Sequence, residues 1–294
     1  MQNFQKESDI MRSILKVEFS RLFRRKELYI SIAIGIILCI WLSIVSNNLF
    51  QEHLSILSEV GPQGTLFPYL ASVFNQFIGI DHFALPTTIL FGIFPLITVF
   101  PYATTYIEDC NSGYIKNIVV RTSKFHYYIS KIIVTMFSAA FVVLSIFFFS
   151  IVITTMFIPE IQPQSTSLTF PVTSSSAMWS SIYRTHPYVY LLLYSFLDAF
   201  FYACFALLAL LFSSFIRYRF IVLIIPTILF YFTTKVLGYI QPWFIDSWKW
   251  MPEAYLRQYQ ITHAKLTPIL VEMLILICIS LLVFFFVGDK KNVL

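Results

Sequence analysis

The chain has 294 residues, of which 58% are apolar, 18% are aromatic and only 12% are charged. Soluble domains carry about 25% charged residues, so this composition excludes an ordinary soluble globule. The net charge of +5 would suit an acidic partner such as nucleic acid. The basic residues lie beside apolar runs, however, which indicates a membrane protein and no nucleic-acid partner.

Residues 10–26 form a basic and amphipathic stretch. Drawn as a helix, the stretch has an apolar face made of Met11, Ile14 or Leu15, Phe19 and Leu22. This pattern predicts an interfacial helix on the inner leaflet of the bilayer. The alternative is a basic flank that only orients the first span. We expect no cleavable signal peptide, because no short apolar core with a small-residue cleavage site precedes the first long apolar run.

Six apolar runs are long enough to cross about 30 Å of hydrocarbon. We expect spans near residues 28–45, 85–107, 132–156, 189–215, 220–240 and 268–287. The predicted fold is an all-α, polytopic membrane protein, and an even number of spans places both termini on one side. With the termini in the cytoplasm, 15 of the 20 Lys and Arg residues are cytoplasmic, as the positive-inside rule requires.

The predicted outer loops differ in character. The first, at 46–81, has an aromatic and apolar later part, residues 66–80, that favours an interfacial or re-entrant helix. The second, at 159–187, is rich in Ser, Thr and Pro and reads as irregular. The third, at 241–266, predicts an aromatic belt at the outer interface through Trp243, Trp248, Trp250 and Tyr255.

A polar and basic segment, residues 108–131 (EDCNSGYIKNIVVRTSKFHYYISK), separates the second and third runs. Helical spacing places four apolar residues on one face: Tyr114, Ile115, Ile118 and Val119. Polar and basic residues fall on the other side: Lys116, Asn117 and Arg121. The segment is too short and too charged to span a membrane, so we expect a cytoplasmic helix that receives force from another protein. The alternative is a basic loop that contacts only lipid headgroups.

This order of residues resembles the coupling loop of the ABC-2 family of transporter permeases. In that family an acidic residue, a glycine, a short amphipathic helix, a small-residue turn and a lysine lead into the next transmembrane helix. The corresponding elements here are Asp109, Gly113, Ile115 to Val119, Thr122-Ser123 and Lys131. The resemblance extends over essentially the whole chain, from the amphipathic stretch through six spans to the short basic C-terminus.

The resemblance implies a single transmembrane permease domain, residues 1–294, in the plasma membrane. Two permease subunits, identical or similar, would sit on two ABC ATPase subunits and move a substrate such as an antimicrobial peptide, drug or lipid-like molecule. The ATPase would contact Asp109, Gly113, Tyr114, Ile115, Ile118, Val119, Arg121, Thr122, Ser123 and Lys124. ATP and Mg would be bound by the partner, because this chain has no GxxxxGK[ST] phosphate loop.

Three charged residues fall within predicted spans, where a charge needs a partner or a function. We expect Asp198, Lys235 and Glu272 to be candidates for a translocation path. Lys235 and Glu272 lie near the outer ends of their spans, and snorkelling to the interface is the competing interpretation. For Asp198 the competing interpretation is a structural hydrogen bond to Tyr194, Tyr202 or a facing helix, and an ion pair with Lys235 is a further alternative.

No other chemistry stands out. The five His residues and four Cys residues show no zinc or disulfide spacing, so no metal site is expected. The sequence contains no HExxH motif, no GxSxG motif and no close pair of intramembrane carboxylates, so no motif predicts an enzyme. An integral membrane enzyme and a non-transporting membrane scaffold subunit remain the two alternative functions.

Overall fold

The computed structural model describes residues 2–60, 72–78, 84–162, 178–240, 250–257 and 265–291. These residues form helices joined by turns and contain no strand. The helices are α1 (Gln2–Phe23), α2 (Lys26–Val60), α3 (Val73–Gln76), α4 (Leu85–Val99), α5 (Thr105–Asn111), α6 (Tyr114–Arg121), α7 (Lys124–Phe157), α8 (Ser180–Thr185), α9 (Pro187–Ser213), α10 (Arg219–Ile240), α11 (Pro252–Leu256) and α12 (Leu266–Lys291).

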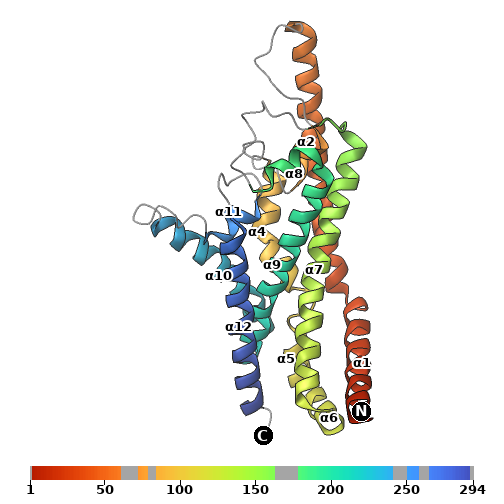
Figure 1. Cartoon of the computed structure of the whole chain (residues 1–294), viewed down its shortest axis with the longest axis vertical. Helices are drawn as coiled ribbons and strands as arrows, with labels where there is room; N and C mark the ends of the chain where they lie inside the picture. Colours follow the sequence, from red (N-terminus) through yellow and green to blue (C-terminus); the bar gives the residue numbers. More distant parts are fainter. Residues whose placement is uncertain are drawn as a thin grey trace.

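The long helices run side by side in an elongated bundle (Figure 1). α7 and α9 pack against each other, α1 and α2 pack on α7, and α10 and α12 pack on α9. α4 lies inside, in contact with α2, α7, α9 and α10. The start of α1 and the end of α12 lie at the same end of the bundle as α5 and α6 (Figure 1). We call this the α6 end.

Within the described residues, five helical segments are long and apolar enough to cross a membrane: Lys26–Glu52 of α2, Lys124–Phe157, Pro187–Ser213, Arg219–Ile240 and Leu266–Phe284 of α12. The protein is therefore a multi-pass, all-helical membrane protein. The sixth predicted span corresponds to α4, which is apolar but has only 15 residues. At 1.5 Å per residue α4 is about 22 Å long, short of the hydrocarbon thickness.

The predicted span at 85–107 is interrupted around Pro101. Pro101 has no backbone N–H with which to continue the helical ladder, and α4 ends two residues before it. Tight turns follow, in which Ala103 N donates to Val99 O at 3.2 Å and Thr105 N donates to Tyr102 O at 3.0 Å. The predicted span at 85–107 is thus not one continuous helix, because a proline falls where the ladder would have to continue.

Most of the predicted amphipathic stretch, residues 10–26, is helical and belongs to α1. This helix lies lengthwise along α7 (Figure 1). The Phe19 ring lies 4.9 Å from that of Phe137, and the Phe23 ring lies 5.8 Å from that of Phe141. Much of its apolar face is thus covered by protein. The basic residue Arg12 stays exposed on the other side.

The outer loops differ from expectation where the structure describes them. α2 continues to Val60, so residues 46–60 are helical and not the start of a loop. Within the predicted interfacial or re-entrant helix, residues 66–80, the structure shows the four-residue α3. Most of the second loop and much of the third fall outside the described residues, including Trp243 and Trp248. In the third loop Trp250 is exposed, whereas Tyr255 is buried.

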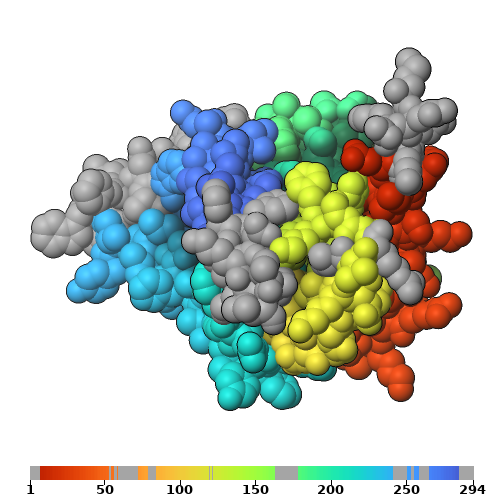
Figure 2. Space-filling model, turned by 90° about the horizontal axis from the view of Figure 1, so that it is seen from below, coloured from red at the N-terminus to blue at the C-terminus, as the bar shows by residue number. Residues whose placement is uncertain are grey.

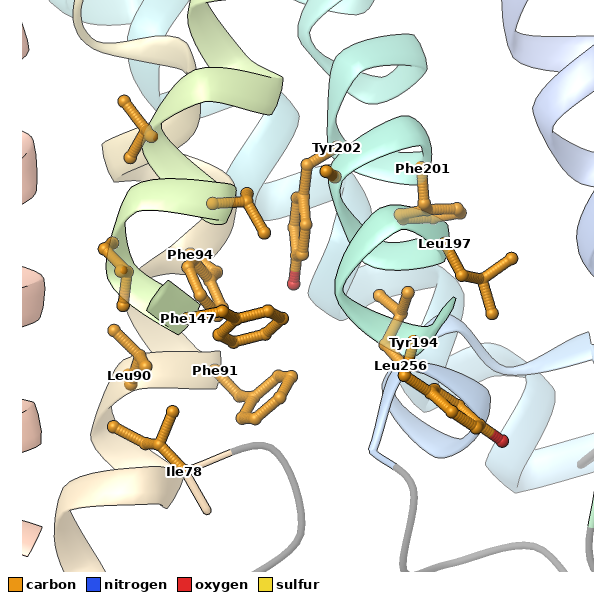
Figure 3. Packing of buried hydrophobic residues seen from close by; sticks show 14 of the residues in the cluster. Ile78, Leu90, Phe91, Phe94, Phe147, Tyr194, Leu197, Phe201, Tyr202 and Leu256 are labelled. Atoms are coloured by element: carbon orange, nitrogen blue, oxygen red, sulfur yellow. The ribbon is translucent and has the colours of Figure 1, made fainter. Parts of the chain in front are cut away.

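Two features of packing fix the bundle. Gly35 lets α2 approach α7 closely, since a Cβ atom at Gly35 would lie 2.3 Å from Cγ1 of Ile146. The core between α4, α7 and α9 is aromatic. Phe94 contacts Phe147 and Tyr202 at ring distances of 5.7 and 5.1 Å, and Figure 3 shows the Tyr202 ring facing these two phenylalanines.

Candidate functional site

Four charged side chains from three helices meet at the α6 end. Glu18 and Arg21 come from α1, Asp109 comes from α5 and Lys131 comes from α7. We call these four residues the charge network. Glu18 and Lys131 are 0% exposed and Asp109 is 1% exposed. Two carboxylates thus balance two cations in a buried site, which is the condition under which buried charge is tolerated.

Each carboxylate of the network is held by both cations. Lys131 Nζ lies 2.9 Å from Glu18 Oε2 and 2.6 Å from Asp109 Oδ2. The Arg21 guanidinium donates two hydrogen bonds to Asp109, from Nη2 to Oδ1 at 2.6 Å and from Nη1 to Oδ2 at 3.2 Å. Nη1 also lies 3.2 Å from Glu18 Oε1. Bidentate pairing of this kind fixes geometry as well as charge.

Two tyrosines complete the network. The Tyr127 hydroxyl donates to Asp109 Oδ2 at 2.7 Å, and the Tyr102 hydroxyl donates to Glu18 Oε2. Lys131 Nζ lies 5.1 Å from the Tyr102 ring centroid and 5.5 Å from that of Tyr127. Tyr102 belongs to the turn after α4. The interruption of the second predicted span therefore supplies a member of the site.

The protonation of Asp109 follows from these contacts. Burial alone would raise the pKa of Asp109, but the hydrogen bond from Arg21 and the charge of Lys131 outweigh it and lower the pKa below its ordinary value. For Arg21, burial lowers the pKa, and the bond to Asp109 together with the charge of Glu18 raises it above its ordinary value. Asp109 therefore stays ionised and Arg21 stays protonated at neutral pH.

A second ion pair extends the network to the junction of α1 and α2 and to α10. Arg25, between α1 and α2, pairs with Glu108 of α5 and donates to Pro101 O at 3.4 Å. That bond gives a partner to a backbone carbonyl in the interrupted span. Arg219 at the start of α10 lies 3.4 Å from Glu108. Elements far apart in the sequence are thus tied to α5.

The predicted short helix within residues 108–131 is confirmed as α6. Gly113 precedes it with φ +70°, a left-handed conformation that favours glycine. At the other end the Thr122 N–H donates to Ile118 O at 2.8 Å. Ser123 caps α7 by accepting from His126 N at 3.4 Å. α7 begins at Lys124 and carries Lys131 in the same continuous helix.

The apolar face of α6 packs inward. Ile115 is 5% exposed and belongs to an apolar cluster with Tyr106, Tyr128 and Phe284, in which the Phe284 ring lies 5.1 Å from Tyr106 and 5.0 Å from Tyr128. Ile118 packs partly against the same cluster. We expected this face to meet a partner, but Ile115 is buried within this cluster of the protein's own residues, and α6 contacts α5 and α7.

The outward surface of the segment consists of other residues. Val120 is 87% exposed and Phe125 at the start of α7 is 58% exposed, beside exposed Lys116 and Asn117. Figure 2 shows the yellow surface of this region next to α1 in the view from below. Among the other predicted coupling residues, Tyr114 contacts Arg21 through its ring. The Arg21 Cζ atom lies 4.8 Å from the centroid of the Tyr114 ring. The side chains of Val119 and Arg121 lie outside the described residues.

Sequence reasoning named Asp109 and Lys131 but missed Glu18, Arg21, Tyr102 and Tyr127. A signal for Glu18 was present. Glu18 stands four residues after Ile14 and four before Leu22, so it falls in the middle of the apolar face of α1. A carboxylate in that position requires a buried cation, and Lys131 is that cation.

The three charges within the spans are placed differently from one another. Asp198 of α9 is 0% exposed, and neither carboxylate oxygen has a hydrogen-bond partner among the described residues. Glu272 of α12 accepts a hydrogen bond from Tyr255 of α11 at 2.5 Å. Lys235 is exposed on α10. No ion pair between Asp198 and Lys235 is found among the described residues.

Comparison with known proteins gives no assignment. No protein-family model matches the chain, and neither the curated proteins nor the solved structures contain a match.

Proposed function

We propose that this protein is the transmembrane subunit of an ABC transporter of the ABC-2 permease type. It would move a substrate across the plasma membrane with force received at α6 from a separate ATPase. The observation that carries the proposal is the charge network, because it joins α1, α5 and α7 directly behind the helix that would receive the force. The arrangement supports a device that transmits movement, whereas a loop that only met lipid headgroups would not need a buried four-charge link.

The contacts suggest how force would travel. α6 is joined to α7 by a two-residue turn and to α5 by the Ser112-Gly113 turn. A push on α6 presses Ile115 against Tyr106 of α5 and Tyr128 of α7. Because Lys131 and Asp109 are linked at 2.6 Å, these helices would move as a unit together with α1.

The turn at residues 100–104 would let α5 move with less displacement of α4. α4 and α5 are separate helices, so the turn between them can change angle without breaking a helical ladder. Tyr102 in this turn donates to Glu18, which ties the turn to α1. Movement at the α6 end would instead be passed to the interior of the bundle along α7, which contacts α4 and α9.

The surface available to the ATPase is the outward side of the segment. Val120, Phe125 and Lys116 are exposed there, and an apolar residue flanked by basic ones suits a groove with an acidic rim. Ile115 is a poor choice for a test, because a charge there would disrupt the buried cluster of Tyr106, Tyr128 and Phe284. Val120 can be changed with little effect on the fold.

The experiment is purification of the tagged chain from its native membrane in mild detergent, identification of bound proteins and measurement of ATP hydrolysis in lipid nanodiscs. We expect an ABC ATPase to co-purify with the wild type. Val120→Asp should reduce its recovery and its turnover about tenfold or more, as expected for an exposed apolar anchor. The matched control is Leu54→Asp, which changes an exposed apolar residue in the part of α2 beyond Glu52.

Three outcomes separate the alternatives. Loss with Val120→Asp but not with Leu54→Asp supports the permease. Purification without any ATPase contradicts it and favours an enzyme or scaffold. An ATPase that stays bound but never hydrolyses ATP in the presence of lipid favours the non-transporting scaffold.

A further inference from the structure

A column of three tyrosines and one aspartate follows one face of α9. Tyr190, Tyr194, Asp198 and Tyr202 are spaced four residues apart and therefore lie above one another on one side of the helix. All four are buried, with exposures of 1%, 3%, 0% and 0%. Asp198 stands 11 residues after the start of α9 at Pro187, about 17 Å along the helix axis, deep within the span.

Asp198 differs from every member of the charge network. Its two oxygens make no hydrogen bond to the described residues, and no described Lys or Arg forms an ion pair with it. A carboxylate in such a place is costly, and an intramembrane acid without a protein partner is expected to meet a cation that is not part of the protein. A structural hydrogen bond to Tyr194 or Tyr202 would have removed this need, but neither tyrosine bonds to Asp198.

The residues near Asp198 indicate which kind of cation could bind there. A divalent metal requires several oxygen or nitrogen ligands, and the described residues contain no group of three His, Cys, Asp or Glu able to hold one. The residues one helical turn before and after Asp198 on α9 are instead the aromatic Tyr194 and Tyr202, both buried. Aromatic faces beside a carboxylate are the chemistry that recognises an organic ammonium group.

A second carboxyl, Glu272 of α12, is connected to α9 through Tyr255. Tyr255 of α11 donates to Glu272 at 2.5 Å, and its ring lies 5.6 Å from that of Phe201 on α9. Burial and the charge of Glu272 raise the pKa of Tyr255, and Asp198 contributes to the same effect. Tyr255 thus connects the Glu272 carboxyl to α9, the helix that carries Asp198.

We propose that Asp198, with the rings of Tyr194 and Tyr202, is a binding site for the ammonium group of a lipophilic or amphipathic amine. The proposal rests on the proposed function in that it names the substrate class of the permease, a cationic amphiphile. Because Asp198 is 0% exposed, the amine reaches it only when the helices around the column separate.

The test is equilibrium binding of radiolabelled tetrapentylammonium to the full chain in nanodiscs, without the ATPase and again with the co-purified complex, with protein-free nanodiscs as background. We expect saturable binding to the wild type and binding at least about tenfold weaker to Asp198→Asn, because the buried counter-charge is lost. Thr234→Val, which removes a buried hydroxyl from α10, is the matched control and should bind as the wild type does.

A second variant keeps the test decisive if Asp198→Asn does not fold. Tyr194→Leu retains the carboxyl and removes one ring, and we expect it to weaken binding several-fold. Equal binding by wild type and either folded variant, or no saturable binding to the wild type in either preparation, overturns the proposal. If binding requires Asp198 but no ATPase co-purifies with the chain, the proposed transporter function is contradicted and the proposed ammonium site is supported.

Discussion

Glu18 and Asp109 at the α6 end and Asp198 in α9 are buried to the same degree, with exposures of 0%, 1% and 0%. Their surroundings are opposite. The first two accept bonds from Arg21, Lys131 and two tyrosines, whereas Asp198 has no bonded partner among the described residues. Burial alone therefore does not determine the role of a carboxylate. The paired carboxylates hold helices together, and for the unpaired Asp198 we propose a ligand.

The largest effect should come from breaking the network on its cationic side. Lys131→Met leaves Glu18 and Asp109 buried with only Arg21 to balance them, so we expect a loss of about 3–5 kcal/mol of folding free energy. The midpoint of thermal unfolding in detergent measures it. Adding Glu18→Gln to Lys131→Met restores neutrality, and most of the loss should be recovered. A single variant as stable as the wild type would contradict the buried pairing.

The midpoint of thermal unfolding should not fall when Asp198 is replaced by an apolar residue. Asp198→Leu removes two unpaired polar atoms from an apolar setting, so we expect stability to be unchanged or raised by about 1–3 kcal/mol. A loss comparable to that of Lys131→Met would show that Asp198 has a bonded protein partner. The comparison between the two sites would then fail.

A smaller effect is expected at Gly113, whose backbone positions α6 next to the network. With φ +70°, Gly113→Ala should cost about 1–2 kcal/mol through backbone strain alone, since nothing lies within 4 Å of the added Cβ atom. Gly238→Ala in α10 is the matched control. Its Cβ atom would meet Met251 Cε at an ordinary 3.4 Å, so we expect no loss. Equal effects of the two substitutions would argue against the left-handed turn.

The smallest effect is a pH dependence that separates the two regions. The pKa of Asp109 lies below its ordinary value of 3.8 in the folded protein, so the unfolded chain takes up this proton first as pH falls. The stabilisation is fully present above that ordinary value and is lost as pH falls through the lowered folded value. Unfolding midpoints measured across the acid range should show this dependence, and Asp109→Asn should reduce it. An unchanged dependence in Asp109→Asn would assign the titration to another group.

Much of the fold was readable from the sequence because apolar runs of span length are strong signals. The five long helices and α6 follow from them, and Gly113 and Ser123 mark where α6 begins and α7 is capped. The interruption at Pro101 and the length of α2 were not predicted. A proline in an apolar run permits either a kink or a break, and a polar stretch such as residues 46–60 can continue a helix when the preceding turns are already formed.

Only two of the four residues of the charge network, Asp109 and Lys131, were predicted from the sequence. Asp109 and Lys131 stand 22 residues apart on either side of α6, and the sequence order brings attention to both. Their partner Glu18 is 113 residues from Lys131, and only packing brings α1 onto α7. Pairing across such a distance depends on tertiary structure, although the position of Glu18 on an apolar face indicated that a partner was needed.

The most direct test of force transmission uses the neutral double variant Lys131→Met/Glu18→Gln in the reconstituted complex with its ATPase. Two quantities are measured in nanodiscs, the amount of ATPase bound and the stimulation of ATP hydrolysis by substrate, with tetrapentylammonium as the first probe. We expect the ATPase to remain bound, because the outward surface around Val120 is unchanged, while stimulation falls about tenfold or more as the link between α1 and α7 is lost. Stimulation equal to that of the wild type would contradict the role of the charge network in coupling.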